Sequence, residues 1–263
     1  MNRFIKIIMK LANRIHLLGP VKFLEVLMTQ PEVRCGVCGG TDFTFRHVLW
    51  DALINEWQIS PAEAEYIDRQ QGETCDICGS NLRSIALANA LRAVFQTKLL
   101  MRDIPSSTTG NNLSILEINE AGSLTKYLKR IGIYTFGAYP AVDLHALPYP
   151  DNVFDIVIHS DTLEHVRYPG QALAECRRVL KPDGAFCFTV PIIMGRLSRS
   201  REGLPKSYHG KQETKLDNYM VHTEFGADVW THIMAAGFTE ISIHSFKYPA
   251  ATAIVARNGW AHR

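Results

Sequence analysis

The chain has 263 residues, of which 46% are hydrophobic and 21% charged, and 28 basic residues against 26 acidic ones give a net charge of +2. This length suits one large domain, or a medium domain with an appendage. The ordinary composition excludes a disordered protein. The balanced charge does not by itself indicate nucleic-acid binding. No apolar run approaches the roughly 18–20 residues that span a membrane.

The N-terminal segment is basic and apolar. Apolar residues recur at helical spacing from Phe4 to Leu18, with basic residues between them. The segment has neither the uninterrupted apolar centre nor the small-residue cleavage site of a signal peptide. We therefore predict an amphipathic helix within residues 1–30. It packs on its own domain or on a partner, or it lies on a membrane surface as a peripheral contact. A cytoplasmic location is expected in each case.

Four of the six cysteines form two matching knuckles, Cys35-Gly-Val-Cys38-Gly and Cys75-Asp-Ile-Cys78-Gly. The two-residue spacing lets both sulfurs of a knuckle reach one ion, and the following glycine permits a tight turn. Four thiolates complete a tetrahedral shell, which is typical of a structural zinc ion and leaves no position for substrate. Iron bound by the same sulfurs is the main alternative. Thiolate ligands also indicate a reducing compartment.

Helix signals follow around and after the first knuckle. The capping box Ser60-Pro-Ala-Glu63 predicts a helix that ends near Gly72. A second helix is expected to begin at Ser80. The turn-forming stretch 105–112 is the expected domain boundary. These features predict a zinc-binding module with helices at 31–110 and a second domain at 111–263.

From residue 113 onward, predicted strands alternate with predicted helices. The short link between residues 138 and 154 has no room for a helix and a full strand. This alternation predicts an α/β fold, with a parallel sheet covered on both faces and ligands at the carboxyl ends of its strands. The sheet is expected to be one strand short, or to have a vestigial strand at 142–144. Strands are predicted at 113–118, 133–138, 154–159 and 185–190, helices at 124–131, 169–180 and 225–236, and a terminal antiparallel pair at 239–246 and 250–256.

Three segments, in this order, resemble a class I S-adenosylmethionine-dependent methyltransferase of the type 11 kind. They are DLHALPYPDNVFD at 143–155, SDTLEHV at 160–166 and RVLKPDG at 178–184. The resemblance covers about residues 113–257. The segment from Cys78 to Arg83 is similar to the end of a zinc module that precedes such domains in some bacterial members. The resemblance implies a Rossmann-like sheet and S-adenosyl-L-methionine as methyl donor.

The resemblance also implies where the cofactor binds. The first strand carries the acid of the family, but the glycine-rich turn after it is altered, with Gly122 displaced by one position. Small residues still allow close backbone approach, and asparagine tolerates a left-handed turn. Tyr139 stands near the usual place of a ribose-binding acid. Asp143 matches an acid near the adenine amino group, unless it only caps its own loop. The implied cofactor-binding residues are Glu117, Asn119, Ala121, Gly122, Tyr139, Asp143, Leu144, Ser160 and Asp161.

The segment Asp161-Thr-Leu-Glu164-His165 has the highest density of reactive side chains. By resemblance, His165 is predicted to be the base or a substrate contact. A second interpretation is a divalent ion held by Asp161, Glu164 and His165 against substrate hydroxyls, and a third is a structural pair. His209 and His222 are further candidates for the base.

Residues 195–226 are rich in arginine and lysine and are expected to cover the acceptor side of the cofactor. Their composition suggests an acidic or phosphorylated substrate, and a solvated loop is an equally consistent interpretation. We expect methyl transfer to an oxygen of a small-molecule or carbohydrate-like acceptor. One alternative is an RNA or protein methyltransferase that uses the zinc module to bind its substrate. Another is a catalytically silent methyltransferase fold that serves assembly.

Overall fold

The computed structural model describes residues 33–208 and 217–258. The predicted helix within residues 1–30 and the candidate base His209 lie outside these ranges. Contacts divide the chain into residues 1–34 and 35–263, and the second unit contains all the helices and strands of the described residues. No helix in these ranges is both long enough and apolar enough to cross a membrane.

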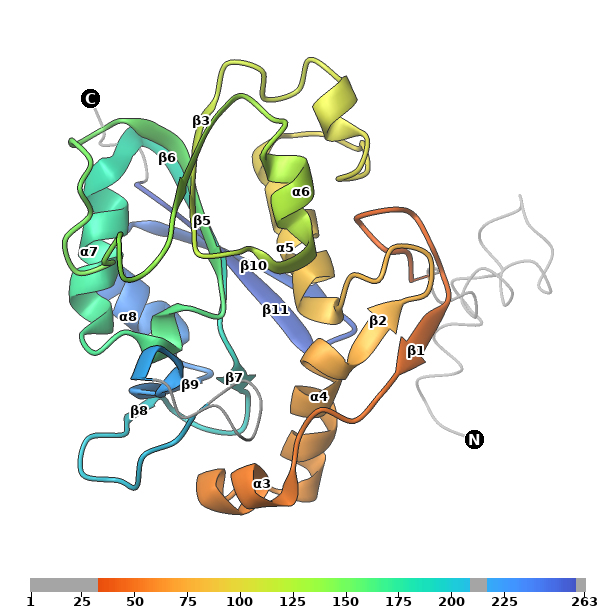
Figure 1. Cartoon of the computed structure of the whole chain (residues 1–263), viewed down its shortest axis with the longest axis vertical. Helices are drawn as coiled ribbons and strands as arrows, with labels where there is room; N and C mark the ends of the chain where they lie inside the picture. Colours follow the sequence, from red (N-terminus) through yellow and green to blue (C-terminus); the bar gives the residue numbers. More distant parts are fainter. Residues whose placement is uncertain (1–32, 209–216, 259–263) are drawn as a thin grey trace, which may run out of the picture. The chain divides into compact units, whose positions relative to one another are not determined.

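A six-stranded sheet forms the centre of the second unit, in the order β10–β11–β6–β5–β3–β4 (Figure 1). Strands β4, β3, β5 and β6 are parallel, whereas β11 runs antiparallel to β6 and β10 antiparallel to β11. The predicted α/β sheet with its terminal antiparallel pair is confirmed. It is a short sheet, because residues 142–144 form no strand and β4 stays at the edge. The strands are β3 (Ser114–Ile118), β4 (Ile133–Gly137), β5 (Phe154–Ser160), β6 (Leu180–Thr189), β10 (Glu240–Phe246) and β11 (Ala251–Arg257).

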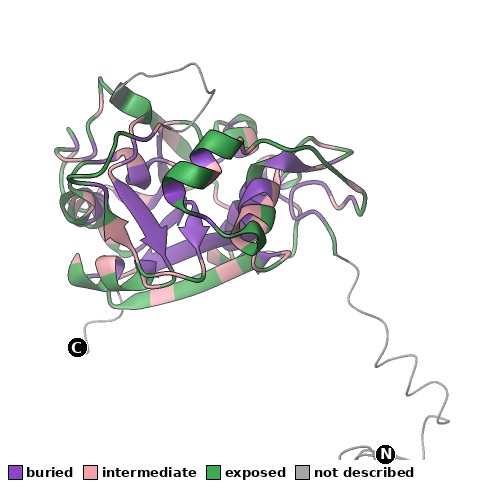
Figure 2. Ribbon diagram, turned by 90° about the horizontal axis from the view of Figure 1, so that it is seen from below, coloured by how far each residue is buried: buried purple, intermediate pink, exposed green. Residues whose placement is uncertain are grey.

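Helices cover both faces of this sheet, so its central strands are buried (Figure 2). Because side chains alternate along a strand, Ile156 and Ile158 of β5 enter one core and Val157 enters the other. Helices α5 (Leu82–Val94) and α6 (Thr125–Leu128) pack on the first side, and α7 (Pro169–Val179) and α8 (Val229–Ala235) on the second.

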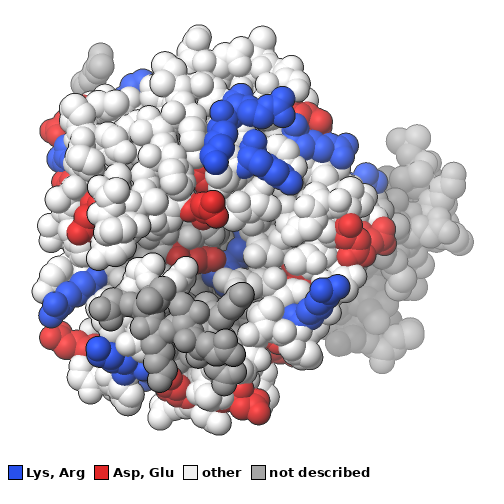
Figure 3. All heavy atoms as spheres, viewed as in Figure 1, with Lys and Arg blue, Asp and Glu red and all other residues white. Residues whose placement is uncertain are grey.

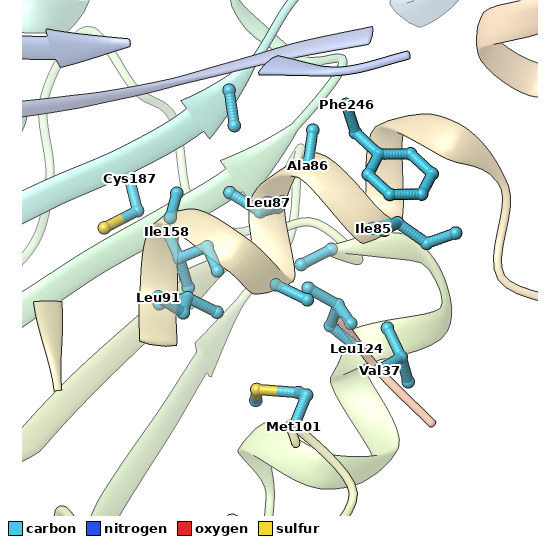
Figure 4. Packing of buried hydrophobic residues seen from close by; sticks show 14 of the residues in the cluster. Val37, Ile85, Ala86, Leu87, Leu91, Met101, Leu124, Ile158, Cys187 and Phe246 are labelled. Carbon is cyan, nitrogen blue, oxygen red and sulfur yellow. The ribbon is translucent and has the colours of Figure 1, made fainter. Parts of the chain in front are cut away.

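The cysteine knuckles belong to the same core as the sheet. Strands β1 (Phe43–Phe45) and β2 (Glu73–Cys75) pair antiparallel beside them. Cys35 and Cys75 fall in one buried cluster with Ile158 of β5. Figure 4 shows Leu87 and Leu91 of α5 beside Ile158. The boundary expected at 105–112 therefore does not separate two hydrophobic cores, because residues before it supply the helix that covers one face of the sheet.

Two helices follow the local signals of the sequence, with one change of cap. Helix α4 (Pro61–Gly72) starts at the predicted capping box, in which the Ser60 side chain accepts from the Glu63 amide and the Glu63 carboxylate accepts from the Ser60 amide. Helix α5 is capped by Asn81, whose side chain accepts from the Ser84 amide at 2.9 Å, and not by the predicted Ser80. A shorter helix, α3 (Asp51–Trp57), precedes α4.

The segment after β6 forms a second, small sheet in the order β7–β9–β8. The helix predicted from Phe225 starts only at Val229, because residues 223–226 pair as a strand. Gly226 lies so close to Arg196 that an added Cβ would be 2.2 Å from its carbonyl oxygen. These strands are β7 (Ile192–Ile193), β8 (Arg199–Ser200) and β9 (Thr223–Gly226), and the 3-10 turns of the unit are η1 (Ile104–Ser106), η2 (Gly122–Leu124), η3 (Leu163–His165) and η4 (Asp217–Tyr219).

Candidate methyl-transfer site and cysteine cluster

The four knuckle cysteines converge on one point. Their sulfur atoms all lie within 4.8 Å of one another, with 3.7 Å between Cys35 and Cys78 and 3.5 Å between Cys38 and Cys75. Four sulfurs at the Zn–S distance of about 2.3 Å in a tetrahedron would be about 3.8 Å apart. The cluster therefore has the dimensions of a single tetrahedral metal site, and the pairs are too far apart for disulfide bonds.

The backbone of each knuckle supports this arrangement. Gly39 and Gly79 have φ of +83° and +70°, which favours glycine, and their amides donate to the carbonyls of Cys35 and Cys75. Burial raises the pKa of the Cys35 thiol and opposes its ionisation. A buried set of four thiolates is stable when a cation is bound, so the donor set fits zinc or iron.

The second knuckle contacts the turn that follows β3. The Cys78 thiol donates to the Ser80 hydroxyl at 3.3 Å, and that hydroxyl lies 2.7 Å from the hydroxyl of Ser123. On the same side, an added Cβ at Gly122 would be 2.8 Å from the Ser84 hydroxyl. The first turn of α5 and the knuckle before it therefore support residues 119–123.

This contact predicts that Ser80→Ala weakens cofactor binding while the metal stays bound. The 119–123 turn would lose a hydrogen bond worth about 0.5–1.5 kcal/mol, so we expect the dissociation constant of S-adenosylmethionine to rise by about two- to tenfold. Calorimetric titration measures the affinity, and elemental analysis of the same sample measures the metal. Ser114→Ala, at the start of β3, is the matched control, and equal affinity in all three proteins would contradict the prediction.

Glu117, the acid of β3, holds the 119–123 turn through hydrogen bonds. Glu117 is fully buried, and its carboxylate accepts from the Ala121 amide at 2.7 Å, from the Thr125 hydroxyl and from the Tyr134 hydroxyl at 2.6 Å. Both oxygens are thus used within the protein. The predicted cofactor residue Glu117 acts on the turn itself, and the exposed residues of the turn are left to meet a ligand.

Asn119 replaces the first glycine of the turn for a visible reason. Its φ is +54°, a left-handed conformation that asparagine tolerates. Its side-chain oxygen accepts from the Tyr139 amide at 3.1 Å, and its side-chain nitrogen donates to the Thr162 hydroxyl at 3.4 Å. One side chain therefore joins the carboxyl ends of β3, β4 and β5. The structure brings the predicted residues Asn119 and Tyr139 together, and their contact with the cofactor stays a prediction.

Asp143 lies beyond the edge strand and caps its own loop. Its carboxylate accepts from both the amide and the ring Nδ1 of His145, each at 2.8 Å. The hydrogen bond from the His145 backbone amide contributes most to holding the pKa of Asp143 below its usual value. His145 Nε2 accepts in turn from the Tyr168 amide. The next residue along the chain, Leu144, is buried in the hydrophobic core. The adenine contact of Asp143 stays a prediction.

A cavity of about 350 Å³ opens beside the carboxyl ends of β5 and β6. Asp161 and Pro191, which follow these two strands, lie on its wall. Arg83, Asp161, Glu164 and His165 supply its charged and titratable side chains, and three of them belong to the predicted segment 161–165. The rest of the wall is mainly apolar and comes from residues before α5, apart from Pro191 and Tyr219. The cavity is lined by Val48, Leu49, Trp50, Leu53, Trp57, Ile59, Ile67, Gln71, Arg83, Asp161, Glu164, His165, Pro191 and Tyr219.

Arg83 was not predicted as a site residue, and it contacts Asp161 at the cavity wall. Its side chain is 7% exposed and forms an ion pair with the Asp161 carboxylate. That carboxylate also accepts from the Thr189 hydroxyl at 3.3 Å, which itself lies 2.8 Å from the Ser160 hydroxyl. The sequence feature that could have indicated Arg83 is its place at the end of the segment from Cys78 to Arg83, two residues after the Asn81 cap of α5.

His165 has a defined hydrogen-bonding state. Its Nδ1 lies 3.1 Å from the Met220 carbonyl oxygen, which can only accept, so Nδ1 carries a proton. Its Nε2 lies 3.7 Å from a carboxylate oxygen of the buried Glu164. An imidazole at the wall of a cavity is a side chain of the kind that can accept a proton from a bound hydroxyl.

The structure does not favour His222 as the base, nor a divalent ion held by Asp161, Glu164 and His165. His222 is not on the cavity wall, and its amide donates to the Glu164 carbonyl. Burial, supported by the charges of Arg167 and His165, lowers its pKa below the usual value. A divalent ion on Asp161, Glu164 and His165 is not supported, since in the described ranges only the cysteines bring three or more ligand atoms together. Asp161 is instead occupied by its ion pair.

The arginines of the basic segment after β6 form ion pairs with glutamates of the same chain. Arg196 pairs with Glu63 at 2.9 Å, and Arg199 pairs with Glu224 at 2.6 Å. Arg201 pairs with Glu224 and also with Glu56. On the face shown in Figure 3, basic side chains gather over α6, and charges of both signs are mixed elsewhere. Arg196 and Arg201 therefore join the segment after β6 to α4 and α3, and Arg199 joins β8 to β9.

Known proteins match the middle of the chain. Residues 94–188 match the family model of a methyltransferase domain. An uncharacterized methyltransferase of Schizosaccharomyces pombe is 48% identical over 44 residues, which are 17% of this chain and 16% of that protein. The ubiquinone/menaquinone biosynthesis C-methyltransferase of Citrobacter koseri is 36% identical over 89 residues, 31% of this chain and 35% of that protein.

These alignments are partial. The chain matches between 14% and 35% of the length of the first curated relatives. Among solved structures, the CMeT domain of the citrinin polyketide synthase is 14% identical with a TM-score of 0.43, covering 80% of this chain and 60% of that one. This overlap is too low to support an inference about activity. The family match and the strand order identify the domain built on the six-stranded sheet, with residues 94–188 as its matched part, as a class I methyltransferase domain.

Proposed function

We propose that this chain transfers a methyl group from S-adenosylmethionine to an oxygen of a small molecule bound in the cavity beside Asp161. The observation that carries the proposal is the position of this cavity. It opens at the carboxyl ends of β5 and β6 and shares Asp161 with the predicted cofactor residues of β3, β4 and β5. Ligands of open α/β sheets bind at this edge.

The residues at the edge fit the donor that the family uses. Asn119, Gly122 and the exposed Tyr139 surround the end of β3, where a ligand can approach the backbone closely. When bound, S-adenosylmethionine would supply a methyl group on a positively charged sulfur. An acceptor oxygen in line with the carbon–sulfur bond would take the methyl group, with the sulfur as leaving group. The chain's own part is to orient the two molecules, to exclude water and to take up a proton.

The proton acceptor in this proposal is His165. The Met220 carbonyl holds Nδ1, so Nε2 is the nitrogen that takes up the proton in this proposal, and it lies 3.7 Å from Glu164. Arg83 holds the Asp161 carboxylate in place through its ion pair. The cysteine cluster has a structural role, because its four ligands leave no position for substrate.

A direct test uses the full, metal-loaded chain. Titration calorimetry with S-adenosylmethionine should show binding, and incubation with the methyl-labelled compound should transfer label to low-molecular-mass material of a cell extract. Absence of cofactor binding in a folded, metal-loaded sample would favour the silent fold and overturn the proposal. Label in RNA, with binding that weakens as salt rises, or label in protein would favour a macromolecular acceptor instead.

Asp143 provides a test of the cofactor position. If its carboxylate accepts from the adenine amino group, Asp143→Ala removes an interaction worth roughly 1–3 kcal/mol, and S-adenosylmethionine affinity should fall about tenfold or more. His145→Ala is the matched control, since it removes the ring partner and keeps the carboxylate. Equal losses in both variants would show that Asp143 only caps its loop.

A further inference from the structure

The lining of the cavity restricts the kind of acceptor. We propose that the acceptor is an uncharged phenol, with its ring against the apolar wall and its hydroxyl at the Asp161–His165 end. This inference rests on the proposed function, because it names the substrate class of the same site. It differs from the acidic or carbohydrate-like acceptor that the sequence suggests.

The apolar part of the cavity wall suits an apolar, flat body. Trp50 and Leu53 come from the start of α3, and Ile59 follows that helix. Trp57 is nearly buried, and its indole N–H already donates to the Ser207 hydroxyl at 2.7 Å. Its ring therefore offers the ligand an apolar surface and no free donor. A sugar placed here would leave several hydroxyls without hydrogen-bond partners, at a cost of about 1–3 kcal/mol each.

The charges of the cavity disfavour an anion. Arg83 is the only lysine or arginine among the described lining residues, and Asp161 neutralises it. An acidic acceptor would have to displace that carboxylate and lie close to the buried Glu164. The nearby Arg201 is held by Glu224 and Glu56 and is not on the wall.

The chemistry at the polar end also favours a phenol over an aliphatic alcohol. A phenol has a pKa near 10, so a neutral imidazole can remove its proton far more easily than that of an aliphatic hydroxyl. In the balanced step, the proton moves to His165 Nε2 and the phenol oxygen forms a bond to the methyl carbon. The carbon–sulfur bond of the donor breaks, and its electron pair stays on sulfur.

Binding of two matched probes tests the inference on the full chain loaded with S-adenosylhomocysteine. We expect 2-naphthol to bind at least tenfold more tightly than 2-naphthoate at neutral pH, as measured by calorimetry. Trp50→Leu should weaken 2-naphthol binding about tenfold. Trp230→Leu, on exposed α8 and away from the cavity wall, is the control and should leave binding unchanged. A second variant, Leu49→Trp, fills the cavity and should also weaken binding if Trp50→Leu does not fold.

The outcomes separate the two proposals. Tighter binding of 2-naphthoate, no binding of 2-naphthol to a chain that binds S-adenosylmethionine, or competition by methyl glucoside would overturn the phenol acceptor and leave the methyltransferase proposal standing. Binding of 2-naphthol that depends on Trp50, in a chain that does not bind S-adenosylmethionine, would leave the apolar cavity in place and overturn the methyltransferase function.

Discussion

Replacing Cys75 by serine is expected to unfold the methyltransferase sheet together with the cysteine knuckles. Structural zinc sites supply on the order of 10 kcal/mol of folding free energy, which is comparable to the whole stability of a domain, about 5–15 kcal/mol. Cys75 shares a buried cluster with Ile158 of the central strand, and α5 covers that face of the sheet. Loss of the metal therefore removes support from both parts at once.

Thermal unfolding followed by far-ultraviolet and near-ultraviolet circular dichroism measures this effect, with a chelator as an independent way to remove the metal. Elemental analysis of the parent should give about one zinc or iron per chain. Cys187→Ser is the matched control, because Cys187 lies in the same cluster and is no ligand. Its cost should be small enough to leave a folded, metal-loaded protein. A Cys75→Ser protein whose sheet melts at the parent's temperature would show that the knuckles form a separate domain, as the sequence suggests.

The features that sequence could predict are local ones. The spacing of Cys35–Cys38 and of Cys75–Cys78 predicts which two sulfurs lie together in each knuckle. Because the two knuckles have the same spacing, the sequence also predicts that they share one site. The capping box at Ser60 and the alternation of strands and helices after residue 113 depend on near neighbours along the chain. The capping box, the sheet and the clustering of the four cysteines are confirmed in the fold.

What the sequence could not show depends on distant partners. The arginines after β6 look like a substrate-binding surface until their partners are known, and Arg196 finds Glu63 at a separation of 133 positions. The stretch 105–112 has the composition of a linker, yet α5 before it packs on strands after it. The cavity likewise joins Trp50 and Trp57 to segment 161–165, which no spacing along the chain could indicate.

His165→Ala is expected to lower turnover at least 10²-fold while S-adenosylmethionine binds as in the parent, since loss of a positioned base costs about 10²–10⁴-fold. The variant removes Nε2, which lies 3.7 Å from a Glu164 carboxylate oxygen, and leaves the predicted cofactor residues of β3 and β4 untouched. Turnover with 2-naphthol and cofactor affinity by calorimetry are the two measurements.

His222→Ala is the matched control for this prediction. His222 is near His165 in the fold and has a lowered pKa, but its ring is not on the cavity wall. It should keep most of the activity, because a base must reach the hydroxyl that it deprotonates. If a metal held by Asp161 and Glu164 were required instead, Asp161→Ala and Glu164→Ala would each match the loss, and a chelator would abolish turnover in a protein whose cysteine cluster stays loaded. Full activity of His165→Ala, with loss in His222→Ala or His209→Ala, would place the base on the segment after β8 and show that His165 only orders the wall beside Met220.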